Sequence, residues 1–182
     1  MLGGVIILLK EIADIVFSFP DNKDGQINDW IYPAFLQEDN IISQVKTESN
    51  MRPNSLCKVA KGDIIIKRIE PQFVNYVSED MNAYIGQNVV IVRGRENVNA
   101  KYLAYILEKN LNALYRDSTG AVLTAVSRKS FDDITIKDLP NMRTQIAIGE
   151  LWWLQKEKNK LRKQLCEKET KLLRYKLKNY DI

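Results

Sequence analysis

The C-terminal segment 141–180 constrains the fold more than any other part of the chain. It contains no proline and a single glycine, Gly149, so the sequence predicts one uninterrupted helix. At about 1.5 Å of rise per residue this helix would be roughly 60 Å long, which exceeds the width of a globular domain formed by the residues before it. We therefore expect the helix to project from a globular domain.

One side of the predicted helix carries apolar residues whose spacing alternates between three and four. This heptad spacing is typical of a coiled-coil seam, and Lys158 and Lys168 occupy its two remaining positions. A single apolar seam in water favours a partner helix, and the two lysines are easier to place in an antiparallel pair than in a parallel one. The alternative is that the leucines fold back along their own domain. The seam residues are Leu151, Leu154, Leu161, Leu165, Leu172 and Tyr175.

A second apolar face near the start of the helix indicates how the helix joins the rest of the chain. The chain divides into a globular domain at 1–140 and a long helix at 141–182. Its 182 residues, 45% hydrophobic and 27% charged, suit one core with an appendage. We expect the second face to pack on the globular domain, and it consists of Ile146, Ile148, Trp152 and Trp153.

The net charge of +4 is distributed unevenly along the chain. Up to Met142 there are 16 basic and 18 acidic residues, a net charge of −2, whereas from Arg143 onward there are 11 basic and 5 acidic residues, a net charge of +6. Domains that bind nucleic acid usually present a basic surface. Bulk charge therefore argues weakly against DNA binding by the globular domain, and only local basic clusters can provide it.

Several other features of the composition narrow the class of protein. No apolar stretch is as long as a membrane span, and the apolar opening at 5–9 is too short and lacks the basic lead-in of a signal peptide, so we expect a cytoplasmic protein. The two cysteines, Cys57 and Cys166, are far apart and suggest neither a disulfide nor a metal site. The chain has no histidine, the commonest general base and transition-metal ligand. We predict no cofactor and no metal.

The coarse pattern of the globular domain predicts an α+β fold with a small mixed or antiparallel sheet and short helices. The most secure strand is the β-branched run at 64–69, which follows a turn signal and stops before a proline. The other expected elements are an amphipathic helix at 9–15, loops and short strands at 20–55, strands at 73–77 and 84–93, a helix at 100–114, a loop at 116–124 and a last short strand region at 126–136.

The order of several phrases along the chain resembles a known family. The phrases are LKEIADI, KGDIIIKRI, YIGQNVVIVRG, NAKYLAYILE, STGAVLTAVSRKSF and ITIKDLPNMRTQIAI, the last leading into the long helix. Their succession covers nearly the whole chain and is similar to the DNA-specificity (S) subunit of type I restriction-modification systems. In that family a target-recognition domain followed by a spacer helix is one half of a subunit that carries two halves in tandem.

This resemblance implies a module that reads one half of a bipartite DNA site. It also implies a spacer helix that pairs antiparallel with the other half and docks methyltransferase subunits, and through them the restriction subunit. Because only one half is present, we expect a homodimer through antiparallel long helices. The recognition domain departs from the expected pattern in not being net basic. The competing hypothesis is a protein-interaction adaptor whose helix oligomerises and whose globular domain does not bind DNA.

Two basic pairs are candidates for contact with the DNA backbone. Lys67 and Arg68 end the apolar strand, and because adjacent strand residues point to opposite faces, at most one of them is expected on a binding surface. Salt bridges within the fold are the alternative for this pair. Arg128 and Lys129 form the only tight basic pair in the second half of the globular domain. They suit backbone contacts, with a solvated turn as the alternative.

Two polar segments are candidates for reading bases. The loop at 116–124 offers a cation, hydroxyl groups and a glycine, which suit contacts to phosphates and base edges, although an ordinary surface turn has the same composition. The irregular early region offers arginine and asparagine, the side chains that pair with guanine and adenine edges. The candidate residues are Arg116, Ser118, Thr119 and Gly120 in the first segment and Arg52 and Asn54, with Lys46 nearby, in the second.

The sequence offers no convincing catalytic motif. Residues 169–171 have the E-x-K form of some nuclease sites, but they lie on the predicted helix without a paired carboxylate before them. Asp132 and Asp133 lack further oxygen ligands for a divalent cation. No glycine-rich phosphate loop and no G-x-S-x-G is present. We therefore predict a protein without catalysis of its own.

Overall fold

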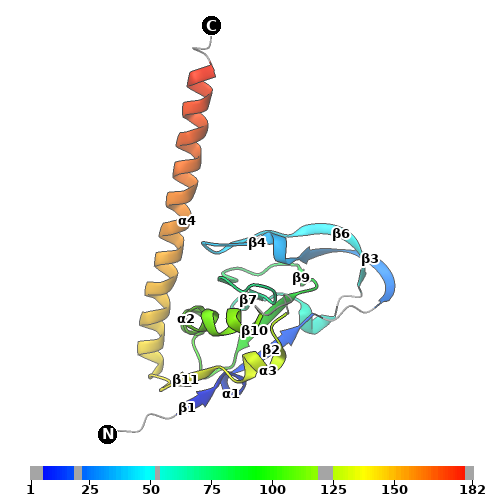
Figure 1. The fold of residues 1–182 in the computed structure, drawn as a ribbon, viewed down its shortest axis with the longest axis vertical. Helices are drawn as coiled ribbons and strands as arrows, with labels where there is room; N and C mark the ends of the chain where they lie inside the picture. Colours follow the sequence, from blue (N-terminus) through cyan, green and yellow to red (C-terminus); the bar gives the residue numbers. More distant parts are fainter. Residues whose placement is uncertain (1–5, 19–21, 52–53, 119–124, 179–182) are drawn as a thin grey trace.

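The computed structural model describes residues 6–18, 22–51, 54–118 and 125–178. It has an α+β fold with the two parts that the sequence predicts, a body built of small sheets and short helices and a long C-terminal helix, α4 (Met142–Lys178). Figure 1 shows α4 beside the body at its start and extending well past it. Among the described residues, no helix is long and apolar enough to cross a membrane.

The central element of the body is a four-stranded antiparallel sheet in the order β2–β10–β7–β8. Its strands are β2 (Ala13–Phe17), β10 (Val89–Gly94), β7 (Ile64–Lys67) and β8 (Val74–Tyr76). The inner strands β7 and β10 are covered on both faces, because Ile64 and Ile66 belong to one core cluster and Ile65 to another. Burial on both faces explains why these strands are unbroken apolar runs rather than alternating ones.

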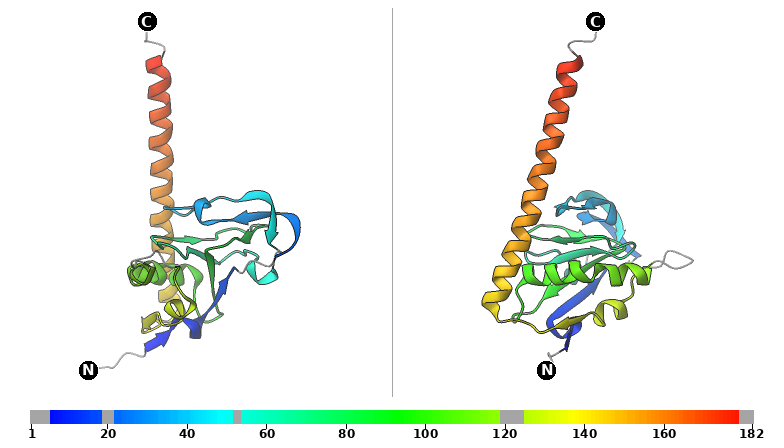
Figure 2. Two further views of the ribbon diagram at one scale, coloured as in Figure 1. Left: turned by 45° about the vertical axis from the view of Figure 1, so that its right-hand side comes forward. Right: turned by 60° about the vertical axis from the view of Figure 1, so that its left-hand side comes forward.

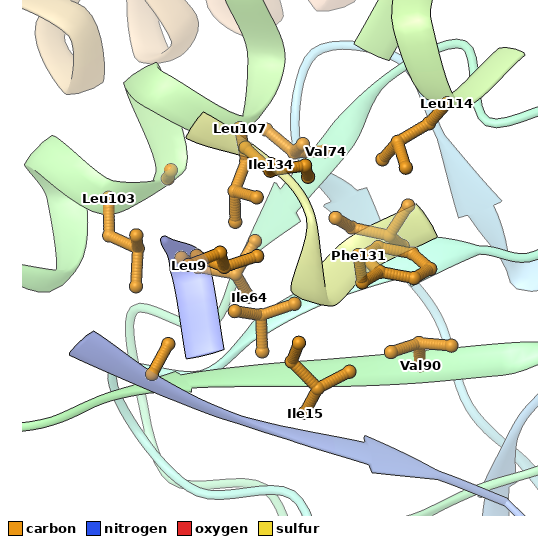
Figure 3. Close-up of a cluster of buried hydrophobic side chains, with 14 of the residues drawn as sticks. Leu9, Ile15, Ile64, Val74, Val90, Leu103, Leu107, Leu114, Phe131 and Ile134 are labelled. Atoms are coloured by element: carbon orange, nitrogen blue, oxygen red, sulfur yellow. The ribbon is translucent and has the colours of Figure 1, made fainter. Parts of the chain in front are cut away.

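The helices and a small terminal sheet cover one face of the central sheet. A single turn, α1 (Leu9–Ile12), α2 (Ala100–Ser118) and α3 (Arg128–Asp132) lie on this side. The first and last strands of the body pair with each other: β1 (Ile6–Leu8) is antiparallel to β11 (Thr135–Lys137). Figure 3 shows the resulting core, in which Leu9, Ile64, Leu103, Leu107 and Phe131 converge from α1, β7, α2 and α3.

The other face of the central sheet is covered by a second sheet in the order β6–β3–β9. Its strands are β3 (Asn22–Ile31), β6 (Val45–Met51) and β9 (Tyr84–Ile85), with β3 antiparallel to β6 and parallel to β9. A turn of 3-10 helix (Pro33–Phe35) and the two-residue strands β4 (Leu36–Gln37) and β5 (Ile41–Ile42) complete this layer. The strand β3 has ten residues, so the expectation of loops and short strands at 20–55 was wrong in part.

Three other boundaries differ from the sequence prediction. The helix expected at 9–15 stops at Ile12, because Ala13–Phe17 alternates buried and half-buried or exposed side chains and pairs with β10 as a strand. The strand expected at 84–93 is divided by a turn in which Asn88 has φ 63°. The strand region expected at 126–136 contains α3, whose first turn is capped by Ser127 through the Ser130 amide at 3.1 Å.

The long helix begins as predicted and packs on the body only through its first turns. Asn141 caps it by accepting a hydrogen bond from the Thr144 amide at 3.0 Å. Gln145, Gly149 and Trp152 are buried against the body, and Ile148 and Trp153 are partly buried there. Ile146 is 44% exposed, so its predicted packing on the body was wrong.

The coiled-coil seam of α4 lies in solvent in the single chain. Its six predicted residues are 54% to 69% exposed, which rules out the alternative that the leucines fold back along their own domain. At about 100° per residue, the seam and the buried stripe of Gln145, Gly149 and Trp152 are roughly 170° apart around the helix. The body therefore occupies one face of α4, and the seam is open on the opposite face.

Candidate nucleic-acid interface

The structure brings together two of the sequence-predicted cations, Arg68 and Arg128, over one aromatic ring. The ring belongs to Phe17, the last residue of β2, which is 5% exposed. The guanidinium carbon of Arg68 lies 4.9 Å from the ring centroid, and that of Arg128 lies 4.8 Å from it. Phe131 of α3 packs edge-on against the same ring, with 5.9 Å between the centroids. We call Phe17, Arg68 and Arg128 the arginine pair site.

Backbone carbonyl groups hold both guanidinium groups in place. The Nε of Arg68 donates to the carbonyl of Val126 at 3.2 Å, and the Nη1 of Arg128 donates to the carbonyl of Ile15 at 2.9 Å. The backbone of Arg68 is fixed as well, because its carbonyl accepts from the Val126 amide at 2.8 Å. The ends of β2 and β7 and the start of α3 therefore meet here, and each arginine keeps guanidinium N–H groups for a ligand.

The charge of the arginine pair site is not neutralised by the described part of the chain. Among the carboxylates whose side chains the structure describes, none forms an ion pair with Arg68 or Arg128. Arg93 is a contrasting case, because Nε and Nη2 bind the carboxylate of the buried Asp63 at 2.7 and 2.8 Å. This hydrogen bonding raises the pKa of Arg93. Arg93 thus stabilises the fold by pairing with a buried carboxylate. The arginine pair site instead presents two positive charges that suit phosphate oxygens.

The two predicted lysines lie apart from this ring. Lys67 ends β7 and places its ammonium nitrogen 4.9 Å from the centroid of Phe73, so the strand pair Lys67 and Arg68 contacts different aromatic residues. Lys129 is exposed on α3 and lines a cavity of about 370 Å³ between α2 and α3. Within the two predicted basic pairs, whose four residues are all described, the two arginines are the ones that share a contact.

The candidates for base reading fall largely at or beyond the limits of the described chain. Arg52, Thr119 and Gly120 lie outside the described residues. The predicted start of the loop at 116–124 was wrong, because α2 continues through Ser118 and so includes Arg116 in its last turn. Asn54 is exposed but caps a 3-10 turn (Ser55–Cys57), its Oδ1 accepting from the Leu56 amide at 2.9 Å.

The residue that sequence reasoning missed is Phe17. The sequence predicts a helix at 9–15 and loops and short strands from residue 20, and it assigns no element to Phe17. Nothing therefore placed Phe17 beside residues that follow it by fifty and more positions. An aromatic residue at the end of an amphipathic segment is most often part of the core, and Phe17 is buried. Only the pairing of β2 with β10 positions it under the two arginines.

Three solved structures resemble the chain along most of its length. The S subunit (HsdS) of Thermoanaerobacter tengcongensis has a TM-score of 0.61 at 19% sequence identity, over 87% of this chain and 38% of that one. The S subunit of a type I restriction-modification system from M. genitalium has a TM-score of 0.64 at 13% identity, over 92% and 43%. The chain has the fold of a type I S subunit. A structure from work on assembly and conformational transition of the type I R-M system matches with a TM-score of 0.63 at 19% identity, over 96% and 44%.

The S-subunit match extends over nearly the whole chain. Because it covers 96% of the chain in one case, it includes both the body and α4. The chain spans less than half the length of each of these three structures. No protein-family model and no curated protein matches the sequence.

Proposed function

We propose that this chain is the DNA-recognition half of a type I S subunit, reading one half of a bipartite site without catalysis of its own. The observation that carries the proposal is the S-subunit fold, which extends over the recognition body and the long helix together. An adaptor that used only its helix would need no such body. The proposed partners are double-stranded DNA, a second half for α4, and methyltransferase subunits that connect the complex to a restriction subunit.

The arginine pair site is the proposed contact to the DNA backbone. Arginine binds phosphate through a planar fork, and the stacking on Phe17 fixes the orientation of that fork before DNA arrives. Such contacts position a protein on the duplex and carry no sequence information directly. Lys129 and Lys67 are proposed to add to the same electrostatic attraction. Base reading is assigned to Arg116, Ser118, Thr119 and Gly120 and to Arg52 and Asn54.

The open seam of α4 is the proposed site of pairing with the second half. Because the body lies on the face of α4 opposite the seam, a second helix can reach the seam without meeting the body of the same chain. An antiparallel pair of two copies would then place the two bodies at opposite ends. This arrangement has the two-fold symmetry that a palindromic split site requires.

Selection from a random DNA pool tests the recognition proposal. The full chain, mixed with a type I methyltransferase subunit, is expected to enrich two identical short half-sites in opposite orientation across an unread spacer. The same selection without the methyltransferase shows how much binding the chain provides alone. An enriched pool without a split motif would contradict DNA recognition and favour the adaptor hypothesis.

The assignment of the base-reading segment gives a second prediction. Replacing Arg116 or Thr119 with Ala should relax the preference at one base pair of each half-site, because a good bidentate base contact contributes roughly 1–3 kcal/mol of discrimination. Lys109→Ala is the matched control, since it removes an exposed cation from the same helix α2. Competition binding with point-substituted half-sites measures the effect. An unchanged preference in normally folded variants would move the reading surface to residues 46–55.

A further inference from the structure

The long helix is joined to the body along a narrow stripe that faces α2. The stripe consists of Gln145, Gly149, Trp152 and Lys156, spaced so that they follow one side of the first turns of α4. Figure 2 shows α2 running across α4 at this level, and the C-terminal part of α4 extending beyond the body. This contact with α2 is the most extensive that α4 makes with the body, and Trp153 adds a ring contact with Tyr76 of β8 at 5.2 Å between the centroids. The direction in which α4 leaves the body therefore depends chiefly on this stripe.

The contact combines directional polar bonds with the apolar packing of Ile148, Trp152 and Trp153. Gln145 is 2% exposed and bridges two segments, because its Oε1 accepts from the Asn99 amide at 2.9 Å and its Nε2 donates to the carbonyl of Pro140 at 2.8 Å. One turn later, the ammonium of Lys101 binds both carboxylate oxygens of Glu150 at 2.7 and 2.8 Å. Hydrogen bonds of this kind constrain orientation, whereas apolar contacts tolerate sliding.

Glu108 of α2 holds the outer end of the stripe. One carboxylate oxygen accepts a hydrogen bond from the indole Nε1 of Trp152, and the other accepts from the ammonium of Lys156. The Lys156 side chain is 13% exposed and that of Glu108 is 30% exposed, so the pair is largely shielded from water. The ammonium of Lys156 also lies 5.7 Å from the Trp152 ring centroid. Both carboxylate oxygens of Glu108 therefore accept hydrogen bonds from side chains of α4.

Gly149 lets the two helices approach at the inner end of the stripe. A Cβ at this position would lie 2.7 Å from the Tyr102 amide nitrogen and 2.8 Å from Oδ1 of Asn99. Both atoms belong to the start of α2, where Asn99 caps the helix by accepting from the Tyr102 amide at 3.0 Å. A backbone nitrogen in a capped turn cannot move aside as a flexible side chain does. Any larger residue must therefore push α2 and α4 apart.

We infer that Glu108 and Gly149 are positioning residues that fix the direction of α4 relative to the body and so set the separation of the two DNA half-sites. The part that concerns DNA rests on the proposed function. From Lys156 to Lys178 the helix extends about 33 Å, so a tilt of about 10° at the stripe moves its end by about 6 Å. That displacement is close to two base-pair steps of about 3.4 Å each.

The direction of α4 is measured first without DNA. A spin label on the native Cys166, exposed on α4, and a second on the exposed body residue introduced by Gln72→Cys report the distance between helix and body, while Cys57 is buried. The labelled full chain is diluted into unlabelled chain so that only distances within one copy are seen. Because Cys166 lies about 15 Å along the helix from Lys156, a tilt of about 10° moves it by about 3 Å. Glu108→Gln and Gly149→Ala are each expected to shift or broaden the distance distribution by about 3 Å or more.

The matched control is Glu157→Gln. It makes the same change as Glu108→Gln, but Glu157 pairs with Lys160 of its own helix, at 3.7 Å. The control is expected to keep the wild-type distance distribution. Selection from a pool with variable spacer length then measures the half-site separation, which is expected to shift or broaden by about one base pair or more in Glu108→Gln and Gly149→Ala only. Loss of stability alone would reduce binding without changing the preferred spacer.

The two measurements keep this inference separate from the proposed function. Unchanged distance distributions in Glu108→Gln and Gly149→Ala would overturn the inference, whatever the DNA selection shows. Altered distances together with an unchanged spacer preference would overturn its DNA part. A wild-type chain that selects no split site in the presence of a methyltransferase would overturn the proposed function and the DNA part together. In that case the distance distributions still decide whether Glu108 and Gly149 position the helix.

Discussion

Replacing Leu161 and Leu165 together with Asp is expected to convert a dimer of this chain into monomers with intact bodies. Burying a leucine contributes about 1.5–3 kcal/mol, and a symmetric helix pair loses four leucines, so the dissociation constant should rise by roughly 10⁴-fold or more. The introduced carboxylates oppose pairing further, because a buried charge without a partner is costly. Light scattering at tens of micromolar protein measures the change in mass.

The control for this prediction is Cys166→Asp combined with Thr170→Asp. These two residues have the same i, i+4 spacing and the same change in charge, and both are exposed on α4 outside the seam. The control is expected to remain dimeric, since it leaves the leucine seam unchanged. Circular dichroism checks that the body and α4 are folded in each variant. A wild-type chain that is strictly monomeric at these concentrations would contradict pairing through the seam.

The long helix was predictable because its evidence lies in consecutive residues. The absence of proline, the heptad spacing and the cap at Asn141 each act within a few residues. The helix Met142–Lys178 starts within one residue of the prediction and continues to the last described residue. The exposure of Leu161 and Leu165 also follows from length, because the helix runs beyond the body. Local signals of this kind need no knowledge of tertiary contacts.

The errors in the body arise where pairing between distant strands outweighs local propensity. Residues 9–15 have helical spacing, yet Ala13–Phe17 is a strand because each of its residues pairs in register with β10. The polar segment at 20–55 shows little apolar alternation, yet the strand β3 forms there because β6 and β9 pair with it on either side. Single-sequence periodicity does not contain that information.

The candidate site was predictable in its parts but not in its arrangement. Charge and position singled out Arg68 and Arg128, which are sixty residues apart, but the sequence placed them in two separate basic pairs with different alternatives. The contact that unites them is with Phe17, which comes from a third segment. Their hydrogen bonds go to the backbone carbonyls of Val126 and Ile15. Every residue has a backbone carbonyl, so the sequence does not indicate which residues accept these bonds.

Removing both charges of the arginine pair site is expected to weaken DNA binding more than any other change to the body. The variant Arg68→Gln with Arg128→Gln keeps an N–H donor at each position for the carbonyl groups of Val126 and Ile15. A hydrogen bond to a charged group contributes about 1.5–3 kcal/mol, so losing two phosphate contacts should raise the dissociation constant roughly 10²- to 10⁴-fold. The loss should be nearly equal for specific and non-specific DNA, because phosphate contacts do not distinguish sequences.

The dependence of binding on salt separates this effect from a loss of folding. Each phosphate contact contributes a slope of about −0.9 to the logarithm of the binding constant against the logarithm of salt concentration, so the double variant should lose about 1.8 of that slope. Arg95→Gln with Lys58→Gln is the control, since Arg95 also donates to a backbone carbonyl but its charge is paired with Asp14 at 2.8 Å. The control removes the same net charge from the body and should keep most of the affinity and slope. Equal slopes in the two double variants, with normal thermal unfolding of both, would show that the arginine pair site does not contact phosphate.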